Sequence, residues 1–200
     1  MEVKEVNLVL AGIGGQGTIL ISDILGNAAI AEGLRVRGAE VLGMAQRGGS
    51  VMSLLRLGSD VLAPLPPEGK GIILAMEPSE ALRNIKYLAE GGTAIINSKK
   101  VIPPAVFLGQ TKYGDLKEII NRIKQVAGKV IMVNALDLAE KAGTSLASNI
   151  VMLGALIASG EIPLKPDTIR QVIDRRFSGK LIEINLRAFE LGLNSEHKKC

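Results

Sequence analysis

The sequence predicts an α/β protein, built as a single Rossmann-like doubly wound domain with a helical C-terminal extension. Three observations favour this fold class. Short apolar runs of strand length alternate with segments of helical periodicity through the first two thirds of the chain. A glycine-rich turn joins the first apolar run to the first helical segment. The remainder holds helical patterns only, and no linker divides the 200 residues, so we expect one domain over 1–200 that ends in a polar tail at 195–200.

The predicted elements follow one another along the chain. The strands share runs of Val, Ile, Leu and Ala bounded by glycine, proline or polar residues. They cover residues 6–11, 34–42, 50–57, 71–76, 93–97 and 129–133. The helices share apolar residues spaced three or four positions apart. They cover residues 18–32, a segment that begins at Pro78, a segment that begins near Asp115, and residues 135–142, 146–158, 167–176 and 181–191.

Composition excludes several classes of protein. Hydrophobic residues make up 47% of the chain and charged residues 22%, a balance typical of globular rather than disordered proteins. Aromatic residues make up only 2%, so base stacking on nucleic acid lacks its platforms. The net charge of +4 is modest, and part of it lies in the tail. For the local basic group we predict a weak anion site at most. Its members are Arg35, Arg37, Arg47 and Arg56.

The single cysteine, Cys200, and the single histidine, His197, both lie in the polar tail. The chain therefore forms no internal disulfide, and it cannot hold an iron–sulfur cluster or a cysteine zinc site. A catalytic dyad or triad built on His or Cys is excluded for the same reason. The charged residues 1–5 lack the pattern of a signal peptide, and no apolar stretch reaches the roughly 20 residues of a membrane span. We expect a cytoplasmic protein that binds neither membrane nor nucleic acid.

The glycine loop after the first strand is the first candidate site. Its G-x-G-x-x-G spacing lets backbone N–H groups approach an anion at the positive end of a helix. The ribose-binding acid of NAD proteins is missing from its usual place, because Arg35 and Arg37 lie there and Glu40 falls inside a strand. NAD binding is therefore disfavoured, and two interpretations stay open: a phosphate or cofactor contact within a complex, and a tight turn that packs against another chain. The predicted cofactor-binding residues here are Gly12, Gly14, Gly15, Gln16 and Gly17.

Residues 43–50 form the second candidate site. They place an amide, a guanidinium and a hydroxyl on a backbone with two adjacent glycines, whose conformational cost indicates positive φ or the close approach of another group. Arg47 can bind a phosphate or carboxylate through two parallel hydrogen bonds, and an ordinary surface loop is the alternative. The predicted cofactor-binding residues here are Gln46, Arg47, Gly48, Gly49 and Ser50.

Polar residues at three other strand ends are weaker candidates. Glu77 and Glu80 flank Pro78 where α/β proteins place ligands, although helix capping is the interpretation that we favour for Glu80. Asn97 and Asn134 each follow an apolar strand. We expect them either to face one crevice or to serve as turn formers and N-caps.

Taken together, the motifs resemble the gamma-type subunits of 2-oxoacid:ferredoxin oxidoreductases. The resemblance covers nearly the whole chain and depends on several motifs in a consistent order. With Gln46 directly before Arg47, the second motif is most similar to the indolepyruvate branch of the family. The motifs lie at residues 12–17, 44–51, 77–82, 91–97 and 149–156.

This resemblance implies a division of labour between two chains. The large (alpha) partner subunit would carry thiamine diphosphate and iron–sulfur clusters, decarboxylate an aryl pyruvate and pass electrons to ferredoxin, with coenzyme A taking the acyl group. This chain would be inactive alone, and its glycine loop and Arg47 would help to close the thiamine diphosphate or coenzyme A pocket.

Three alternatives to this assignment remain. Within the family, the chain would be the gamma subunit of a pyruvate or branched-chain 2-oxoacid enzyme. Outside the family, it would be a free-standing nucleotide-binding protein, or a purely structural subunit whose glycines only pack.

Overall fold

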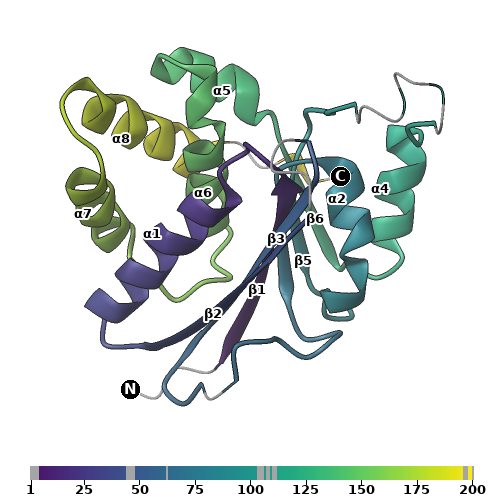
Figure 1. Ribbon diagram of the computed structural model, residues 1–200, viewed down its shortest axis with the longest axis horizontal. Coiled ribbons are helices and arrows are strands. Elements are labelled where there is room, and N and C mark those ends of the chain that lie inside the picture. The colour runs from purple at the N-terminus through teal and green to yellow at the C-terminus, as the bar shows by residue number, and fades with distance from the viewer. Residues whose placement is uncertain are drawn as a thin grey trace.

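A computed structural model gives the fold of the chain and describes residues 5–43, 48–61, 63–102, 106, 109, 112–195 and 198–199. Within these ranges a seven-stranded mixed sheet has the order β2-β3-β1-β4-β5-β6-β7 (Figure 1). The strands are β1 (Val6–Ile13), β2 (Arg35–Leu42), β3 (Ser50–Gly58), β4 (Ile72–Ala75), β5 (Thr93–Asn97), β6 (Lys129–Val133) and β7 (Lys198–Lys199).

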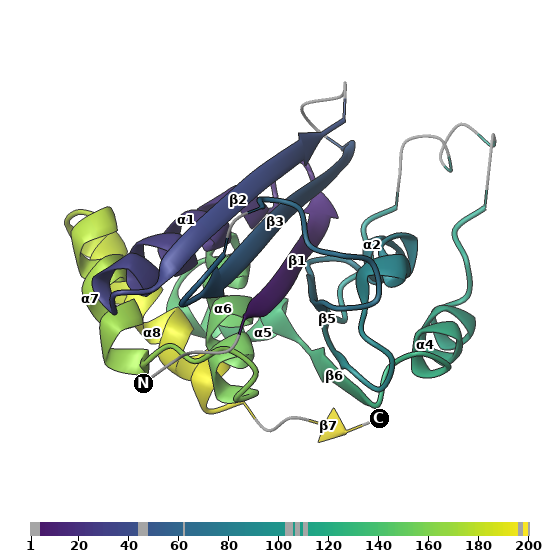
Figure 2. The same ribbon diagram turned by 90° about the horizontal axis from the view of Figure 1, so that it is seen from below.

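Helices cover both faces of this sheet, as the doubly wound prediction requires. One layer contains α1, α5, α6, α7 and α8, and the other contains α2 and α4 (Figures 1 and 2). Two short 3-10 turns also occur: η1 (Ile85–Tyr87) follows α2, and η2 (Ser145–Ala147) lies between α5 and α6. The helices are α1 (Thr18–Ala31), α2 (Pro78–Arg83), α4 (Leu116–Lys124), α5 (Ala135–Ala142), α6 (Ser148–Ala158), α7 (Pro166–Arg176) and α8 (Lys180–Leu193).

The two layers explain why the central strands read as unbroken apolar runs. On β1, Leu8 and Leu10 pack in the core shared with α1, α6 and α8, whereas Val9 and Ala11 pack in the core shared with α2 and α4. A strand buried on both faces has no polar side to alternate with its apolar side. Each fully buried leucine contributes roughly 1.5–3 kcal/mol relative to exposure.

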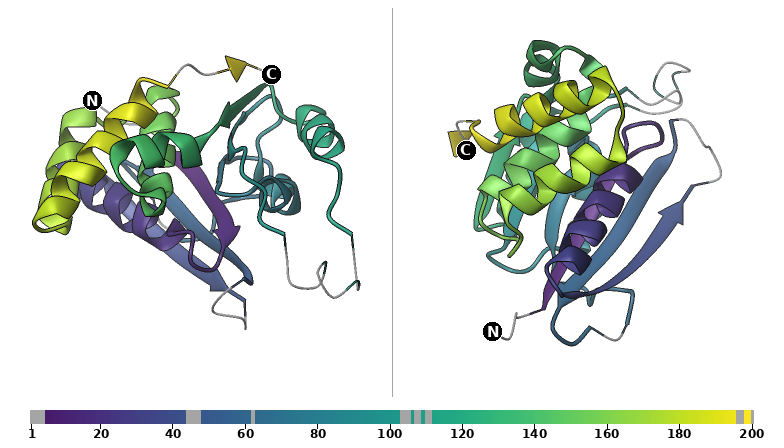
Figure 3. Two further views of the ribbon diagram at one scale, coloured as in Figure 1. Left: turned by 90° about the horizontal axis from the view of Figure 1, so that it is seen from above. Right: turned by 90° about the vertical axis from the view of Figure 1, so that its left-hand side faces the viewer.

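The β2–β3 hairpin departs from an all-parallel Rossmann sheet. Strands β1, β4, β5 and β6 are parallel, but β3 pairs antiparallel with both β1 and β2. The connection from Leu42 to Ser50 is shorter than the dozen or so residues that a parallel crossover requires, so the chain turns back on itself. As a result, β2 lies at the rim of the sheet beside α1 (Figure 3), and most of its residues are exposed.

The C-terminal part is helical as predicted up to Leu193, but it is not helical throughout. Lys198–Lys199 pair antiparallel with Ile131 and Met132 of β6, so part of the polar tail joins the sheet as a strand that was not predicted. The added strand gives hydrogen-bond partners to backbone groups of β6 that would otherwise form a sheet edge. Among the described residues, no helix has both the length and the apolar character needed to cross a bilayer.

Two glycines allow α6 and α8 to pack with their backbones in contact. A Cβ atom at Gly192 would lie 2.0 Å from the carbonyl oxygen of Val151, and one at Gly154 would lie 2.3 Å from that of Phe189. Residues 149–157 of α6 are all buried, so neither helix has room to move aside.

The substitution Gly192→Ala is therefore expected to lower the free energy of unfolding by about 1–3 kcal/mol, the usual cost of forcing extra volume into a close-packed contact. The matched control is Gly26→Ala in α1, where the nearest atom to a new Cβ is the Val36 Cγ1 at 3.7 Å. That change is expected to add roughly 0.5–1 kcal/mol of helix propensity. Urea unfolding measures both values, and equal stability of the two variants would contradict the close contact.

Candidate functional site

The glycine loop joins β1 to α1 at the edge of the sheet where the parallel strands end. Gly17 is the N-cap of α1 with φ 76° and has no side chain to cap the helix, and the first turn contains no acidic residue. Gly15 has φ 99° and is exposed. The loop thus presents the positive end of a 14-residue helix without a built-in counter-charge, which is suitable for an anion.

The structure brings the two candidate segments together. The N–H of Gly14 donates to the carbonyl of Gly49 at 2.8 Å, and the N–H of Gly48 donates to the carbonyl of Gly14 at 3.5 Å. Gly48 has φ 78°, which satisfies the prediction of a positive φ in the glycine pair. Of the predicted residues, Gln46 and Arg47 lie outside the described part of the chain.

Gln16 uses its amide to shape the loop. Its Oε1 accepts from the N–H of Ile13 at 2.7 Å, and its Nε2 donates to the carbonyl of Met76 at 3.2 Å. The side chain thus closes the turn that it belongs to and attaches it to the end of β4. Both ends of the Gln16 amide therefore bind backbone groups of this chain and stabilise the loop.

Close packing accounts for two of the loop glycines. A Cβ at Gly12 would lie 2.9 Å from the Thr18 Cγ2, and one at Gly17 would lie 2.2 Å from the Asn149 Nδ2. At Gly15 no atom lies within 4 Å of a new Cβ. Packing therefore explains Gly12 and Gly17, but their neighbours belong to this chain and not to another chain as that interpretation assumed. Gly15 has no such neighbour and is accessible to a ligand.

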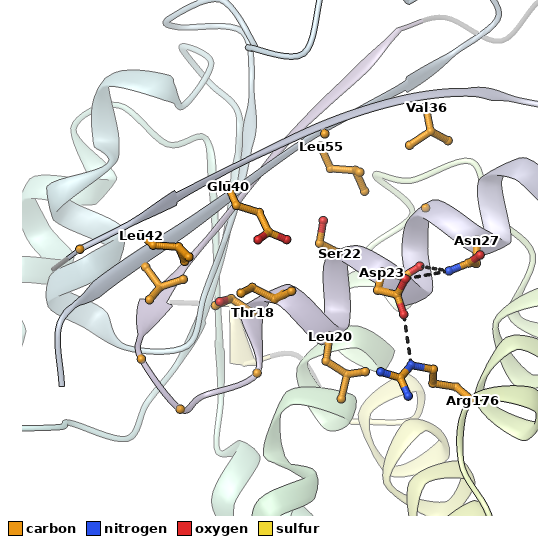
Figure 4. A pocket seen from close by; sticks show the side chains of 18 of the residues that line it. Thr18, Leu20, Ser22, Asp23, Asn27, Val36, Glu40, Leu42, Leu55 and Arg176 are labelled. Atoms are coloured by element: carbon orange, nitrogen blue, oxygen red, sulfur yellow. Dashed lines mark hydrogen bonds and ion pairs between the residues drawn. The ribbon is translucent and has the colours of Figure 1, made fainter. Parts of the chain in front are cut away.

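A groove of about 1210 Å³ begins at the glycine loop and runs between α1 and the β2–β3 hairpin (Figure 4). The carboxylate of Glu40 points into it from β2, and Asp23 on α1 pairs with Arg176 at 3.2 Å. Glu40, which was set aside as a ribose-binding acid because it falls inside a strand, is thus a residue of the groove. The sequence signal for this placement is the alternation of side chains along a strand, which places every second residue on the same face. These alternate residues are Val36, Gly38, Glu40 and Leu42.

The structure gives the helix-capping role to Glu77 and not to Glu80. Glu77 is the N-cap of α2, and its Oε2 accepts from the N–H groups of Ser79 at 2.8 Å and Glu80 at 3.2 Å. The capping interpretation of Glu80 is therefore wrong. Its side chain accepts from the Ser50 Oγ at 2.5 Å and from the Arg83 Nε at 3.1 Å, so it contacts the second candidate segment.

The other oxygen of Glu77 holds the connection between β5 and α4. Its Oε1 accepts from the N–H of Val101 at 3.5 Å and from the hydroxyl of Tyr113. Both ends of this connection are thus attached to one fully buried carboxylate. Burial raises the pKa of the Tyr113 phenol, and the hydrogen bond to Glu77 raises that pKa further.

The two asparagines at strand ends do not share a crevice. Asn97 is buried, donates to the carbonyl of Met76 at 3.3 Å and accepts from the N–H of Ala135 at 3.4 Å. Asn134 is exposed and caps α5, with its side chain accepting from the N–H of Asp137 at 3.5 Å. The turn and N-cap interpretation is confirmed for Asn134, and the shared-crevice expectation is wrong.

Two members of the basic group are engaged in ion pairs within the chain. Arg56 is buried, and its guanidinium is 2.6 Å from Glu5 and 2.9 Å from the Asn7 Oδ1. Its hydrogen bond lowers the pKa of the Glu5 carboxyl. Arg35 pairs with Asp60 at 2.8 Å instead. Within the described ranges, no group of three or more His, Cys, Asp or Glu side chains is arranged to hold a metal ion.

The substitution Gln16→Glu tests the closing role of this side chain. Glutamate keeps the acceptor for Ile13 but places a carboxylate oxygen against the carbonyl of Met76, so stability is expected to fall by about 1–3 kcal/mol at neutral pH. A protonated carboxyl donates again, so the loss should shrink as the pH falls toward and below about 4.3. Thermal unfolding across pH measures this, and a loss independent of pH would contradict the assignment.

Tyr113→Phe tests the attachment to Glu77, and is expected to lower stability by about 1 kcal/mol at neutral pH. The pKa of Tyr113 is raised in the fold, so its contribution is complete below the unfolded value of about 10 and is lost as the pH rises through the folded value. The difference between wild type and variant should therefore be constant to about pH 9 and shrink above it. Tyr87→Phe, in η1, is the control, and a difference that grows at high pH would overturn the attachment.

Comparison with known proteins agrees with this geometry. A family model described as pyruvate ferredoxin/flavodoxin oxidoreductase matches residues 7–195. The indolepyruvate oxidoreductase subunit IorB of Archaeoglobus fulgidus is 44% identical over 94% of both chains. The ketoisovalerate oxidoreductase subunit VorA of Methanothermobacter thermautotrophicus is 30% identical over 96% of this chain, which spans 36% of that protein.

Among solved structures, the pyruvate oxidoreductase subunit PORC of Thermotoga maritima has a similar fold, with a TM-score of 0.69 at 21% identity over 94% of this chain and 95% of that one. The 2-oxoglutarate:ferredoxin oxidoreductase of Magnetococcus marinus has a similar fold as well, with a TM-score of 0.73. The match covers 95% of this chain and 30% of that one at 20% identity, and that structure contains 2-oxoglutarate, coenzyme A and succinyl-CoA. The resemblance inferred from the motifs is confirmed: this chain belongs to the pyruvate ferredoxin/flavodoxin oxidoreductase family.

Proposed function

We propose that this chain is the small (beta) subunit of an indolepyruvate:ferredoxin oxidoreductase. It supports the coenzyme A-dependent oxidative decarboxylation of aryl pyruvates, with ferredoxin as electron acceptor. The observation that carries the proposal is the 44% identity to an indolepyruvate oxidoreductase subunit across nearly the full length of both chains. Identity to the ketoisovalerate subunit is lower, at 30%, and so favours the indolepyruvate branch.

The groups available in this chain fit coenzyme A better than they fit the other cofactors of such a complex. A single cysteine cannot hold an iron–sulfur cluster, so we assign those clusters to the large partner subunit. We place thiamine diphosphate there too, because the family resemblance implies it. The open N-terminus of α1 suits a phosphate group. The groove beside it, about 1210 Å³, exceeds the roughly 300–1,000 Å³ of an ordinary small-molecule pocket. A long ligand, or one shared with the partner, is consistent with that size.

Within this proposal the residues have distinct tasks. Gly15 and the first turn of α1 receive a phosphate through backbone N–H groups, and Arg47 pairs with it through two parallel hydrogen bonds. Glu40 disfavours an anion farther along the groove, so the phosphate end is directed toward the glycine loop. When the partner subunit covers the loop, water is excluded and these interactions strengthen.

Isolation of the native complex tests the assignment. We expect the chain to purify with a larger subunit whose visible spectrum shows iron–sulfur clusters, and the complex to reduce ferredoxin faster with indolepyruvate than with pyruvate or ketoisovalerate. Preference for either of the latter would move the protein to another branch of the family. Oxidation of a keto acid by this chain alone would remove the division of labour altogether.

In the reconstituted complex, Arg47→Ala is expected to raise the KM for coenzyme A at least about tenfold, because a charge-assisted hydrogen bond is lost. The KM for indolepyruvate should stay unchanged. Arg122→Ala is the matched control, since Arg122 is exposed on α4 across the sheet from α1. Steady-state kinetics with each substrate varied in turn gives both constants, and an unaltered KM for coenzyme A would leave the loop only a structural role.

A further inference from the structure

We propose that Glu80 is a positioning residue for the glycine loop, which it supports through Ser50 from the opposite face of the sheet. The proposal rests on the function assigned above to the glycine loop. We call the contact between Gly14 and the Gly48–Gly49 pair the loop junction. Glu80 touches neither coenzyme nor substrate in this scheme, and its effect passes through one hydroxyl.

The contact geometry supports a specific role for the Glu80 carboxylate. Glu80 lies in the first turn of α2 and is 4% exposed. One of its oxygens accepts from the Ser50 Oγ at 2.5 Å, and the other accepts from the Arg83 Nε at 3.1 Å. Burial of a carboxylate is costly without such hydrogen bonds. Because the Arg83 side chain is 64% exposed, solvent screens that ion pair, and Ser50 is the less screened of the two contacts.

Ser50 connects this carboxylate to the loop junction. It is the first residue of β3 and pairs with Ile13, the last residue of β1. Its carbonyl accepts from the N–H of Gly43 at 3.2 Å, and the preceding carbonyl, of Gly49, accepts from the N–H of Gly14 at 2.8 Å. A hydroxyl held from α2 therefore fixes a backbone segment that contacts the glycine loop directly and anchors the chain at Gly43.

The same hydrogen bond changes what Ser50 can offer a ligand. A carboxylate only accepts hydrogen bonds, so the hydroxyl proton of Ser50 is committed to Glu80. Ser50, predicted from the sequence to bind the cofactor, can then only accept from a ligand. Its principal contribution is the position of the Gly48–Gly49 backbone.

The test uses the assembled oxidoreductase and the variants Glu80→Ala, Glu80→Gln and Ser50→Ala. Glutamine retains an oxygen that accepts from Ser50, whereas alanine does not. We expect Glu80→Ala to raise the KM for coenzyme A about tenfold with the KM for the 2-oxoacid unchanged, and Glu80→Gln to stay within about threefold of wild type. Ser50→Ala should match Glu80→Ala, and the double variant should add little to either, because both changes break one contact.

Glu118→Ala is the matched control. Glu118 is an exposed acid in the first turn of α4, in the same layer as α2, so it shares the favourable helix-dipole position without a contact to the loops. It should leave both KM values unchanged. A parallel rise in both KM values for Glu80→Ala, or a Glu80→Gln variant as impaired as Glu80→Ala, would overturn the positioning role.

Amide hydrogen exchange provides a readout that does not depend on turnover. In Ser50→Ala, exchange at the N–H groups of Gly14 and Gly43 should quicken, while that of Ile95 in the central strand β5 should not change. Unchanged protection at Gly14 would refute the proposal even if Glu80→Ala failed to fold. A wild-type complex without coenzyme A-dependent activity would instead refute the proposed function, and the exchange result would still decide the role of Glu80.

Discussion

The carbonyl oxygen of Met76 is the atom on which the shape of the site depends. It accepts from the side-chain amides of Gln16 and Asn97, so the ends of β1, β4 and β5 are joined at one point. The same two amides use their oxygens to hold the N–H groups of Ile13 and Ala135. In a buried network of this kind each member satisfies the next, and loss of one leaves an unpaired group in a medium of low dielectric. The glycine loop is thus attached to the sheet through the same carbonyl that joins the strand ends.

Much of the fold could be predicted from the sequence, because its strands and helices carry strong periodic signals. The bounds of β5 and β6 agree with the prediction, as do those of α5. The strand order could not be predicted, since the insertion of β3 between β1 and β2 is a long-range pairing that no local pattern encodes. The antiparallel direction of the hairpin was accessible, because a connection as short as that between Leu42 and Ser50 leaves no room for a crossover helix.

The site was predicted less completely than the fold. Spacing identified the glycine loop, but the need for glycine at position 17 comes from Asn149, far away in the sequence. That Glu77 rather than Glu80 caps α2 could have been predicted from the sequence. Proline favours the first helical position, so Pro78 makes Glu77 the N-cap. No sequence signal indicated the contact of Glu80 with Ser50, since the two residues lie in different elements and are 30 positions apart. Family membership followed from ordered motifs, which are more specific than any single loop.

The exposed rim strand β2 has a consequence for how the protein is made. One edge of β2 pairs with β3, and Val41 and Leu42 at its end are 50% and 58% exposed. A strand edge of this length with apolar side chains invites pairing with any other extended chain. We therefore expect the chain on its own to aggregate through this edge when it is concentrated for crystallisation or cryo-microscopy.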